Sequence, residues 1–314
     1  MVRPMADSYE IIIVGGGPAG AAAAVYAARK RLKTLFITNE WGGQSTVSTD
    51  VQNWIGTPSI SGAELAASLK KHVESYAGEW LTVVSPALAT KLEATDALVR
   101  VTTKDGKTYE AGAALVTTGA NRRRLDIPGA AKYDQKGLTY CASCDGPLFA
   151  DKDVLVVGGG NAGFETALQL LAYCKSVALL HKTDAFRADK ISVDAALANP
   201  KMHAYTNAEP VAIEGNQFVT GVRWKDNKTG EEHRADVEGV FVEIGLIPNT
   251  EWVKGVVDMN EFNMIKIDSR TQRTSHPRIW AAGDCTDILY HQNNIAAGDA
   301  VRALEDIYMN LKRA

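Results

Sequence analysis

The chain has few cysteines, four in 314 residues, and this low number excludes a small scaffold held together by disulfides. Cys141 and Cys144 are the only closely spaced pair, and in a reducing compartment such a pair indicates zinc binding or redox catalysis. Structural zinc needs four ligands, and the sequence has no second C-x-x-C and no H-x-x-x-H. We therefore expect no metal site and favour redox chemistry.

The chain also lacks a strong charge of either sign. Its 34 basic and 37 acidic residues leave a net charge of -3, too small to attract nucleic acid or a membrane surface. Two short basic runs, 29–31 and 122–124, are typical of solvated helix ends and loops. The length of 314 residues favours two domains, and we expect neither a nucleic-acid partner nor a membrane partner.

No apolar stretch is typical of a membrane span. Residues 11–28 carry no charge, but Gly15-Gly16-Gly17-Pro18 would break a helix there and much of the remainder is alanine. Asp7 and Glu10 do not suit the start of a signal peptide. We therefore expect a cytoplasmic protein without a targeting segment, with residues 1–8 disordered or frayed.

The same stretch is instead typical of a strand, a tight turn and a helix. Residues 11–14 predict a buried parallel strand, an Ala-rich helix follows to about residue 31, and 34–38 predict the next strand. In the G-x-G-x-x-G between them, Gly15 permits the turn, Gly17 lets the backbone approach a pyrophosphate, and Gly20 lets the helix pack closely. Glu40 lies where an acid would bind a ribose hydroxyl. The turn therefore predicts dinucleotide binding, and the alternative is a glycine-rich turn without a ligand.

The opening pattern recurs 143 residues later, counted from Gly15 to Gly158. A β-branched run, 154–157, leads into GGGNAG at 158–163, and a helix over 164–173 and a strand over 177–180 follow. An internal repeat of this kind predicts two Rossmann-type domains. The second turn places Gly158, Gly160, Asn161 and Gly163 as candidate nucleotide-binding residues.

Other local patterns predict the remaining elements. Ser61 and Glu64 form a capping box that starts an amphipathic helix to about residue 76. Residues 81–101 and 108–117 predict short strands of a meander. A strand near 279–282 ends in Gly283-Asp284, and an Ala-rich helix is expected from about 294 to 311.

Seven motifs in this order carry a family resemblance: GGGPAG (15–20), GGQ (42–44), VQNW (51–54), TTGA (117–120), CASCDG (141–146), GGGNAG (158–163) and AAGDC (281–285). The chain resembles the low-molecular-weight thioredoxin reductase family from Tyr9 to Ala314. CDGPLF (144–149) and VFVEIGLIPNTEW (240–252) look closer still to the flavoprotein subunit of alkyl hydroperoxide reductase. That subunit has an N-terminal extension with a second C-x-x-C, whereas this chain starts at the first strand, so the stand-alone reductase is the expected match.

The resemblance implies an α/β fold with two Rossmann-like dinucleotide-binding domains of the three-layer ββα type. FAD is expected in residues 1–119 and 246–314, and NAD(P)H in the inserted residues 120–245, which carry the C-x-x-C. Hinges are expected at 119–122 and 245–248. Besides the first turn and Glu40, the residues implied beside FAD are Gly43, Gln44, Asn53, Gly119, Gly283, Asp284 and Gln292.

The resemblance also implies roles at the dithiol. Cys144 should face the flavin, and Cys141 should attack the disulfide of a protein substrate as its thiolate. Asp145 is placed to manage the proton of this pair, and its alternative role is a helix cap. Cys174 and Cys285 are expected to be buried packing residues, and tryptophans 54, 224, 252 and 280 are expected to pack rather than stack on a cofactor.

The choice of nucleotide depends on the residues after the strand at 177–180. An acid there would favour NADH and cations would favour the 2′-phosphate of NADPH. The chain has His181, Lys182 and Thr183 there and Arg187 further on, whereas NADPH-dependent relatives usually have two adjacent arginines after the histidine. The sequence favours NADPH and leaves NADH, or a donor such as reduced ferredoxin, open.

The predicted function is a homodimeric, FAD-dependent thioredoxin-disulfide reductase. Electrons would pass from NAD(P)H through FAD and the Cys141/Cys144 pair to thioredoxin or a thioredoxin-like protein. Four alternatives stay open: a reductase of a dedicated peroxiredoxin-type partner, a ferredoxin-dependent variant, a flavin-binding redox sensor without turnover, and an oxidase of small dithiols.

Overall fold

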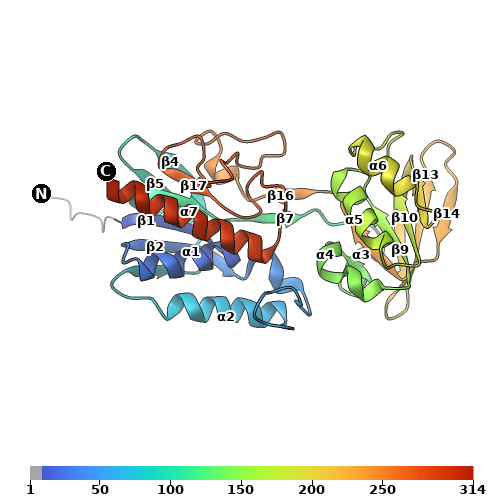
Figure 1. Cartoon of the computed structure of the whole chain (residues 1–314), viewed down its shortest axis with the longest axis horizontal. Helices are drawn as coiled ribbons and strands as arrows, with labels where there is room; N and C mark the ends of the chain where they lie inside the picture. The colour runs from blue at the N-terminus through green and yellow to red at the C-terminus, as the bar shows by residue number, and fades with distance from the viewer. Residues whose placement is uncertain (1–8, 314) are drawn as a thin grey trace, which may run out of the picture. The chain divides into compact units, whose positions relative to one another are not determined.

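The computed structural model describes residues 9–313. Residues 1–8, expected from the sequence to be frayed, lie outside the described residues. The chain forms two compact units (Figure 1): unit 1 runs up to Asn121 and resumes at Ile247, and unit 2 is Arg122–Leu246. Which nucleotide each unit binds stays a prediction.

Unit 1 contains a mostly parallel sheet with helices on one face. Its strands are β1 (Tyr9–Gly16), β2 (Thr34–Trp41), β3 (Leu81–Val84), β4 (Ala89–Ala94), β5 (Val99–Thr103), β6 (Thr108–Val116) and β17 (Ile279–Ala281). Its helices are α1 (Pro18–Arg29), α2 (Gly62–Glu74) and α7 (Asn293–Arg313), with 3₁₀ turns at Gly43–Val47 and Glu251–Val253. α1 and α7 pack side by side (Figure 1).

The strand order in unit 1 is β3-β2-β1-β6-β5-β4, with β17 also paired to β6. The start of β6 pairs with β5 in antiparallel fashion, whereas its end pairs with β1 and β17 in parallel. β6 therefore belongs both to the parallel sheet and to the meander β4-β5-β6. The prediction that 81–101 is all meander is wrong for β3, which pairs in parallel with β2, because its apolar side chains continue the buried sheet.

Side chains alternate across the sheet and give unit 1 its layers. Ile11 and Ile13 on β1 pack in the core under α1 and α7, while Ile12 and Val14 pack in the core shared with the meander. This alternation follows from the two-residue period of a strand. The arrangement confirms the predicted three-layer α/β fold.

Unit 2 repeats this plan. Its parallel strands are β8 (Leu138–Thr139), β9 (Asp153–Val157), β10 (Ser176–Leu180), β11 (Met202–Tyr205) and β15 (Gly239–Val242), in the order β11-β10-β9-β15-β8. A separate antiparallel sheet consists of β12 (Ala208–Gly215), β13 (Val219–Asp226) and β14 (Glu232–Ala235). Its helices are α3 (Ala130–Tyr133), α4 (Ala142–Asp145), α5 (Asn161–Leu171) and α6 (Lys190–Leu197), with a 3₁₀ turn at Gly146–Phe149.

The internal repeat extends to the packing. Val154 and Val156 face the helical core of unit 2, and Leu155 and Val157 face the antiparallel sheet. These four positions lie 143 residues after Ile11, Ile13, Ile12 and Val14, respectively, so the core sides match between the units. The prediction of two Rossmann-like domains is confirmed.

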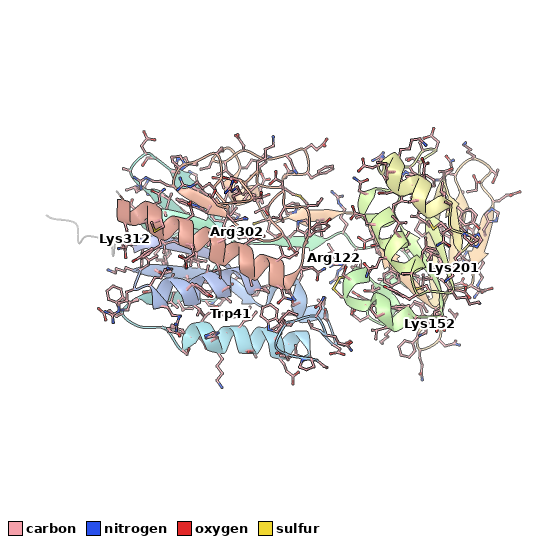
Figure 2. The ribbon with its side chains drawn as sticks, in the orientation of Figure 1. Trp41, Arg122, Lys152, Lys201, Arg302 and Lys312 are labelled. Atoms are coloured by element: carbon pink, nitrogen blue, oxygen red, sulfur yellow. A yellow bond between two sulfur atoms is a disulfide. The ribbon has the colours of Figure 1, made fainter. Side chains whose placement is uncertain are left out.

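The chain crosses between the units twice. β7 (Ala120–Arg122) and β16 (Leu246–Pro248) pair as a two-stranded sheet at these crossings, and Arg122, which ends β7, is labelled in Figure 2. Both crossings coincide with the predicted hinge segments. Bending at them stays a prediction.

Three further observations bear on the sequence predictions. The capping box at the start of α2 is present, since Ser61 accepts from the Glu64 amide and Glu64 accepts from the Ser61 amide. Within residues 9–313, no helix is long and apolar enough to cross a membrane. The same part of the chain has no group of three His, Cys, Asp or Glu side chains that would hold a metal ion.

Candidate functional site: two dinucleotide turns and a dithiol

The glycine turn between β1 and α1 has no room for a side chain at the first and last glycines of its G-x-G-x-x-G. Gly15 has a φ of +126°, and a Cβ there would lie 2.2 Å from the Thr117 carbonyl oxygen. A Cβ at Gly20 would lie 1.8 Å from the Gly15 carbonyl oxygen. Gly17 differs, because a Cβ there would meet nothing within 4 Å. Its backbone is therefore open to a group approaching the start of α1.

The turn between β9 and α5 repeats this geometry. Gly158 has a φ of +122°, and its Cβ would lie 2.1 Å from the Glu243 carbonyl oxygen. A Cβ at Gly163 would lie 1.8 Å from the Gly158 carbonyl oxygen, and a Cβ at Gly160 would meet nothing within 4 Å. Each unit therefore presents an open second glycine before a helix N-terminus, the arrangement that accepts a pyrophosphate.

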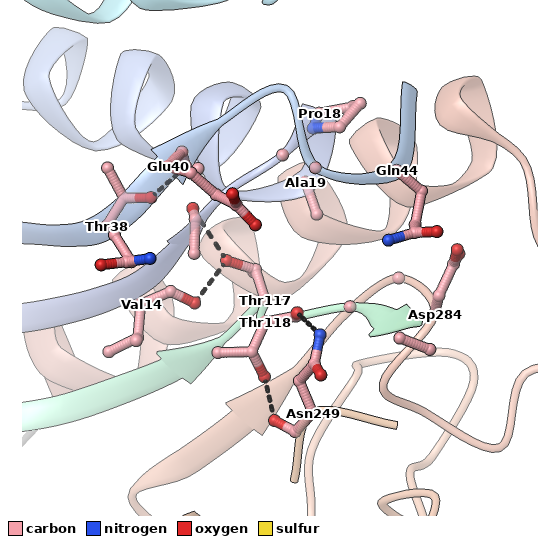
Figure 3. Close-up of a pocket in the computed structure, with 18 of the residues that line it drawn as sticks. Val14, Pro18, Ala19, Thr38, Glu40, Gln44, Thr117, Thr118, Asn249 and Asp284 are labelled. Atoms are coloured by element: carbon pink, nitrogen blue, oxygen red, sulfur yellow. Dashed lines mark hydrogen bonds between the residues drawn. The ribbon is translucent and has the colours of Figure 1, made fainter. Parts of the chain in front are cut away.

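In unit 1 the turn opens into a cavity of about 350 Å³ (Figure 3). The cavity is also bounded by β2, the ends of β6 and β17, and the start of α7. Of the residues predicted beside FAD, it is lined by Gly15, Gly17, Glu40, Gly43, Gln44, Gly119, Gly283 and Asp284.

Three predicted residues do not line this cavity. Gly20 packs against the turn instead. Asn53 and Gln292 hydrogen-bond to each other, with the Asn53 amide donating across 3.2 Å. The structure thus brings the last two together from segments far apart in the sequence.

Asn249 and Trp252 line the cavity although sequence reasoning gave them no binding role. Asn249 donates its side-chain amide to the Thr118 carbonyl across 2.9 Å, and the Thr118 hydroxyl donates to the Asn249 carbonyl across 2.7 Å (Figure 3). Trp252 was expected only to pack in the core. It does pack there, and it also lines the cavity. The segment IPNTEW, which carries part of the family resemblance, was the available signal for both.

The cavity fits the dinucleotide that the resemblance implies. The open backbone at Gly17 leaves room for a phosphate, and Glu40 stands at the end of β2 where a ribose hydroxyl would be bound. Trp252 keeps its Nε1 buried with no hydrogen-bond partner among the described residues. A buried donor of this kind needs an acceptor, and a polar ligand would supply one.

In unit 2, His181 follows β10 and supports the glycine turn. The Gly159 amide donates to His181 Nδ1 across 3.2 Å, and His181 Nε2 lies 2.7 Å from the Thr183 hydroxyl oxygen. Burial lowers the pKa of His181, and the nearby Arg187 and Lys182 charges act in the same direction. His181 is therefore a neutral hydrogen-bonding residue near neutral pH rather than a cation.

The two predicted cations of this region, Lys182 and Arg187, have exposed side chains. The Arg187 amide donates to the Gly159 carbonyl across 2.8 Å, which fixes its segment against the turn. Asn161 is tied to the same segment by two hydrogen bonds. Its side-chain amide donates to the Asp189 carboxylate across 3.2 Å, and its side-chain oxygen accepts from the Asp189 backbone N–H across 2.7 Å.

Cys141 and Cys144 form a disulfide, with an S–S distance of 2.10 Å. Cys141 caps the N-terminus of α4, and its Sγ accepts from the Cys144 amide across 3.2 Å. Cys144 is exposed and Cys141 is half-buried. A donated N–H at sulfur favours the thiolate form once the pair is reduced.

α5 holds the dithiol segment in place. Gln169 donates to the Ala142 carbonyl across 3.1 Å and accepts from the Ser143 hydroxyl across 3.2 Å. A Cβ at Gly146 would lie 2.2 Å from the Tyr173 hydroxyl, so the lack of a side chain here lets Tyr173, just after α5, pack closely against the segment. The helix that follows the nucleotide turn therefore also positions the redox pair.

Asp145 follows Cys144 directly and accepts a hydrogen bond from the Thr139 hydroxyl. Burial raises the pKa of Asp145, while the Thr139 hydrogen bond and the Arg122 charge oppose the rise. The 3₁₀ turn after Asp145 has no side-chain cap, so the helix-cap alternative is wrong.

The other two cysteines are buried, as predicted. The Cys174 thiol donates to the Phe149 carbonyl across 3.2 Å. Burial raises the pKa of Cys174 to about 11 and that of Cys285 to about 12, so both stay protonated thiols near neutral pH.

Comparison with known proteins places this geometry in a family. The family model described as pyridine nucleotide-disulphide oxidoreductase matches residues 9–303. The F subunit of alkyl hydroperoxide reductase of Staphylococcus aureus is 39% identical over 297 residues, which cover 95% of this chain and 58% of the relative. A Bacillus subtilis protein named NADH dehydrogenase is 38% identical, with 95% of this chain and 57% of the relative covered. The chain thus spans somewhat more than half the length of these relatives.

The solved structures agree. Thioredoxin reductase from Streptococcus pyogenes is 36% identical, with a TM-score of 0.88 and coverage of 98% of this chain and 99% of that one. The family model spans both glycine turns and the dithiol between them, and the family implies FAD and a pyridine nucleotide as cofactors. The chain therefore belongs to the pyridine nucleotide-disulphide oxidoreductase family.

Proposed function

We propose that this protein reduces the disulfide of a thioredoxin or thioredoxin-like protein, using electrons that pass from NADPH through FAD to Cys141 and Cys144. The Cys141–Cys144 disulfide carries this proposal, because it lies in the same unit as a complete dinucleotide turn and is held there by α5. A second dinucleotide turn in unit 1 supports a separate flavin site.

FAD would be held in the unit 1 cavity. The Gly15–Gly17 backbone and the start of α1 would face its pyrophosphate, and Glu40 would accept from a ribose hydroxyl. Asp284 and Gln44 line other parts of the same cavity. When bound, the flavin supplies the conversion between hydride from a nicotinamide and the electron pair that opens a disulfide.

The disulfide exchange itself needs only this chain's thiols and a proton. Two electrons and a proton open the Cys141–Cys144 bond to one thiolate and one thiol. The Cys141 thiolate attacks the partner's disulfide, forms a mixed disulfide and releases one partner thiolate. The Cys144 thiolate then attacks Cys141 Sγ, which restores the internal disulfide and releases the partner's second thiolate.

Asp145 would hold and move the proton in this exchange. Its raised pKa supports a carboxyl group that is protonated more readily than an exposed aspartic acid. Its place directly after Cys144 puts it next to the thiol that must lose a proton before the second attack.

The donor is proposed to be NADPH because Lys182 and Arg187 are exposed cations after β10 and no acid follows this strand directly. Lysine offers a single charge rather than a bidentate grip on phosphate. The name of the Bacillus subtilis relative refers to NADH, which supports NADH as the second candidate.

The partner surface would surround the Cys141–Cys144 pair, because Cys141 attacks the partner's disulfide. Leu148, four residues after Cys144, is 59% exposed, and an apolar side chain at this place suits docking of a protein partner. A dedicated partner of peroxiredoxin type is the second candidate. The 39% sequence identity to the F subunit of alkyl hydroperoxide reductase supports it. A homodimer and a cytoplasmic location stay predictions from the resemblance and the sequence.

Anaerobic reduction of the purified yellow protein tests the relay. NADPH and NADH are added separately, and the flavin absorbance is followed. Rapid bleaching by NADPH but not NADH is expected. Bleaching by dithionite alone would overturn the nicotinamide donor and favour a ferredoxin-type donor or a sensor without turnover.

Turnover with candidate substrates then tests the partner. Purified thioredoxin and a peroxiredoxin with its own small thiol carrier are compared at equal concentration. Faster oxidation of NADPH with thioredoxin is expected. Turnover with only the second system, or oxygen consumption with a small dithiol alone, would replace the proposed substrate.

A further inference from the structure

Glu243 is a half-buried acid beside the nucleotide turn of unit 2 that the relay described above does not use. It directly follows β15, at the carboxyl edge of the parallel sheet. Its amide donates to the Val157 carbonyl across 2.8 Å, and its own carbonyl lies against Gly158. The side chain therefore starts at the edge where ligands bind in sheets of this type.

Thr117 occupies the same place in unit 1. Its amide donates to the Val14 carbonyl across 2.9 Å, and its carbonyl lies against Gly15. Thr117 lines the unit 1 cavity together with Gly17 and Glu40, the residue at the end of the neighbouring strand β2. By this equivalence Glu243 lines the nucleotide site of unit 2.

The position of Glu243 in the sheet predicts which half of the nucleotide lies beside it. The residues after β10, including His181 and Lys182, lie on one side of the central strand β9, and this side takes the adenosine ribose. The pyrophosphate belongs at the glycine turn. β15 lies on the other side of β9, so the remaining half, the nicotinamide ribose and ring, would extend towards Glu243.

Several groups set the charge of Glu243. The Thr166 hydroxyl on α5 donates to Glu243 Oε1 across 2.9 Å. Burial raises the pKa of Glu243 to about 7, the Thr166 hydrogen bond and the Arg122 charge oppose the rise, and Glu165 adds to it. Its charge therefore changes near neutral pH, whereas threonine at the equivalent place in unit 1 is uncharged.

We propose that Glu243 contacts the nicotinamide half of the bound nucleotide and that its carboxylate favours the oxidised, positively charged ring over the reduced, uncharged one. This inference rests on the proposed nicotinamide nucleotide site in unit 2. A negative charge in a partly buried site attracts a nearby positive ring strongly because solvent screens it poorly. The ionised form of Glu243 would therefore assist hydride donation, in which the ring becomes positive, and retain the oxidised nucleotide longer.

Calorimetric titration of the FAD-loaded protein tests this inference. The probes are NADP⁺ and the tetrahydronicotinamide analogue of NADPH, whose ring is uncharged and donates no hydride. The control ligand is 2′-phospho-ADP-ribose, which lacks nicotinamide and reports the titration of the phosphate and of the adenosine side. Each is titrated at about pH 6 and about pH 8, on either side of the pKa of about 7.

The wild-type affinity for NADP⁺ relative to the uncharged analogue should rise about tenfold between the two pH values. Glu243→Gln should abolish that rise, because its side-chain oxygen still accepts from Thr166 but carries no charge. Binding of 2′-phospho-ADP-ribose should be the same in both proteins. If the donor test above selects NADH, then NAD⁺, the tetrahydronicotinamide analogue of NADH and ADP-ribose replace the phosphorylated probes.

The outcomes separate this inference from the proposed function. If the wild-type protein binds all three probes but the ratio does not change with pH, or if Glu243→Gln keeps the change, the role of Glu243 is wrong and the nucleotide site stands. If no probe of either series binds, the nucleotide site and this inference both fail.

Discussion

Ser143 and Gln169 are joined by a hydrogen bond of 3.2 Å that ties the redox turn to the helix of the nucleotide site. Gln169 also donates to the Ala142 carbonyl, so one side chain fixes two residues of the C-x-x-C loop. Since the thiols must meet a partner disulfide in a narrow range of geometry, the contact links the position of α5 to redox chemistry.

Loss of this contact should slow disulfide exchange more than it lowers stability. Gln169→Leu removes both hydrogen bonds to the C-x-x-C loop, worth about 1 kcal/mol each, and leaves the α4 segment less well held. We expect turnover with the protein substrate to fall about tenfold, with flavin reduction by the nucleotide unchanged. Ser143→Ala, which removes only one of the bonds, should show a smaller effect. Equal turnover in all three proteins would contradict a positioning role for Gln169.

Replacing the exposed thiol should stop the relay without removing the flavin. Cys144→Ser cannot form the internal disulfide, and we expect turnover to be lost while the FAD content and flavin spectrum remain. Cys174→Ser is the matched control, because burial raises the pKa of Cys174 to about 11 and leaves it unreactive near neutral pH. Normal disulfide reduction by Cys144→Ser would contradict the role of Cys144 in electron transfer.

The acid beside the dithiol should set part of the pH profile of turnover. Asp145→Asn should lower turnover by about 10²-fold or more. Thr139→Val removes the hydrogen bond that lowers the pKa of Asp145, so the protonated form should persist to higher pH. The limb of the pH profile that depends on Asp145 should therefore move upwards. A pH profile identical to that of the wild-type protein would mean that another group supplies the proton.

Two glycines of the first turn should respond differently to a methyl group. Gly17→Ala meets no protein atom within 4 Å, so the apoprotein should melt as before while FAD affinity falls, because the methyl group occupies the open approach to the backbone. Gly20→Ala would place Cβ 1.8 Å from the Gly15 carbonyl oxygen and should destabilise unit 1 itself. The measurements are melting of the apoprotein and FAD content after reconstitution. Unchanged FAD affinity in Gly17→Ala would place the pyrophosphate elsewhere.

Glu243 should make stability depend on pH. Its pKa is raised from 4.5 to about 7, so the carboxyl group is protonated in the folded state at pH values where it ionises in the unfolded chain. Its stabilising contribution is complete below about pH 4.5 and is lost as the pH rises to about 7. Because the group is half-buried, we expect a loss of about 1–2 kcal/mol in the free energy of unfolding after allowance for screening.

Glu243→Gln removes this titration. The wild-type protein should lose stability relative to the variant between about pH 5 and pH 7, as measured by chemical denaturation at each pH. Thr166→Val, which removes a hydrogen bond that lowers the same pKa, should extend the loss to higher pH. Parallel stability curves for wild type and Glu243→Gln would show that Glu243 does not titrate in this range.

Features that depend on neighbouring residues could be predicted from the amino-acid sequence. The two glycine turns, the C-x-x-C and the Ser61–Glu64 capping box are each set by a few adjacent residues, because φ angles, close backbone approach and helix capping are local constraints. The strand period of two also places alternate residues of β1 and β9 on opposite faces of their sheets. These local patterns and their repetition were sufficient to predict the α/β fold with two Rossmann-like units.

The contacts between residues distant in the sequence became known from the folded structure alone. β3 joined the parallel sheet, Thr139 met Asp145, and Gln169 met the redox loop through contacts that no local pattern records. Asn249 reached the unit 1 cavity through its hydrogen bonds to Thr118 after β6, and Trp252 follows it there. Glu243 reached the turn at Gly158 because β15, which precedes it, pairs with β9. The charge of a carboxyl group such as Glu243 depends on its burial and its neighbours, so its pKa was settled by the folded structure and not by the residue type.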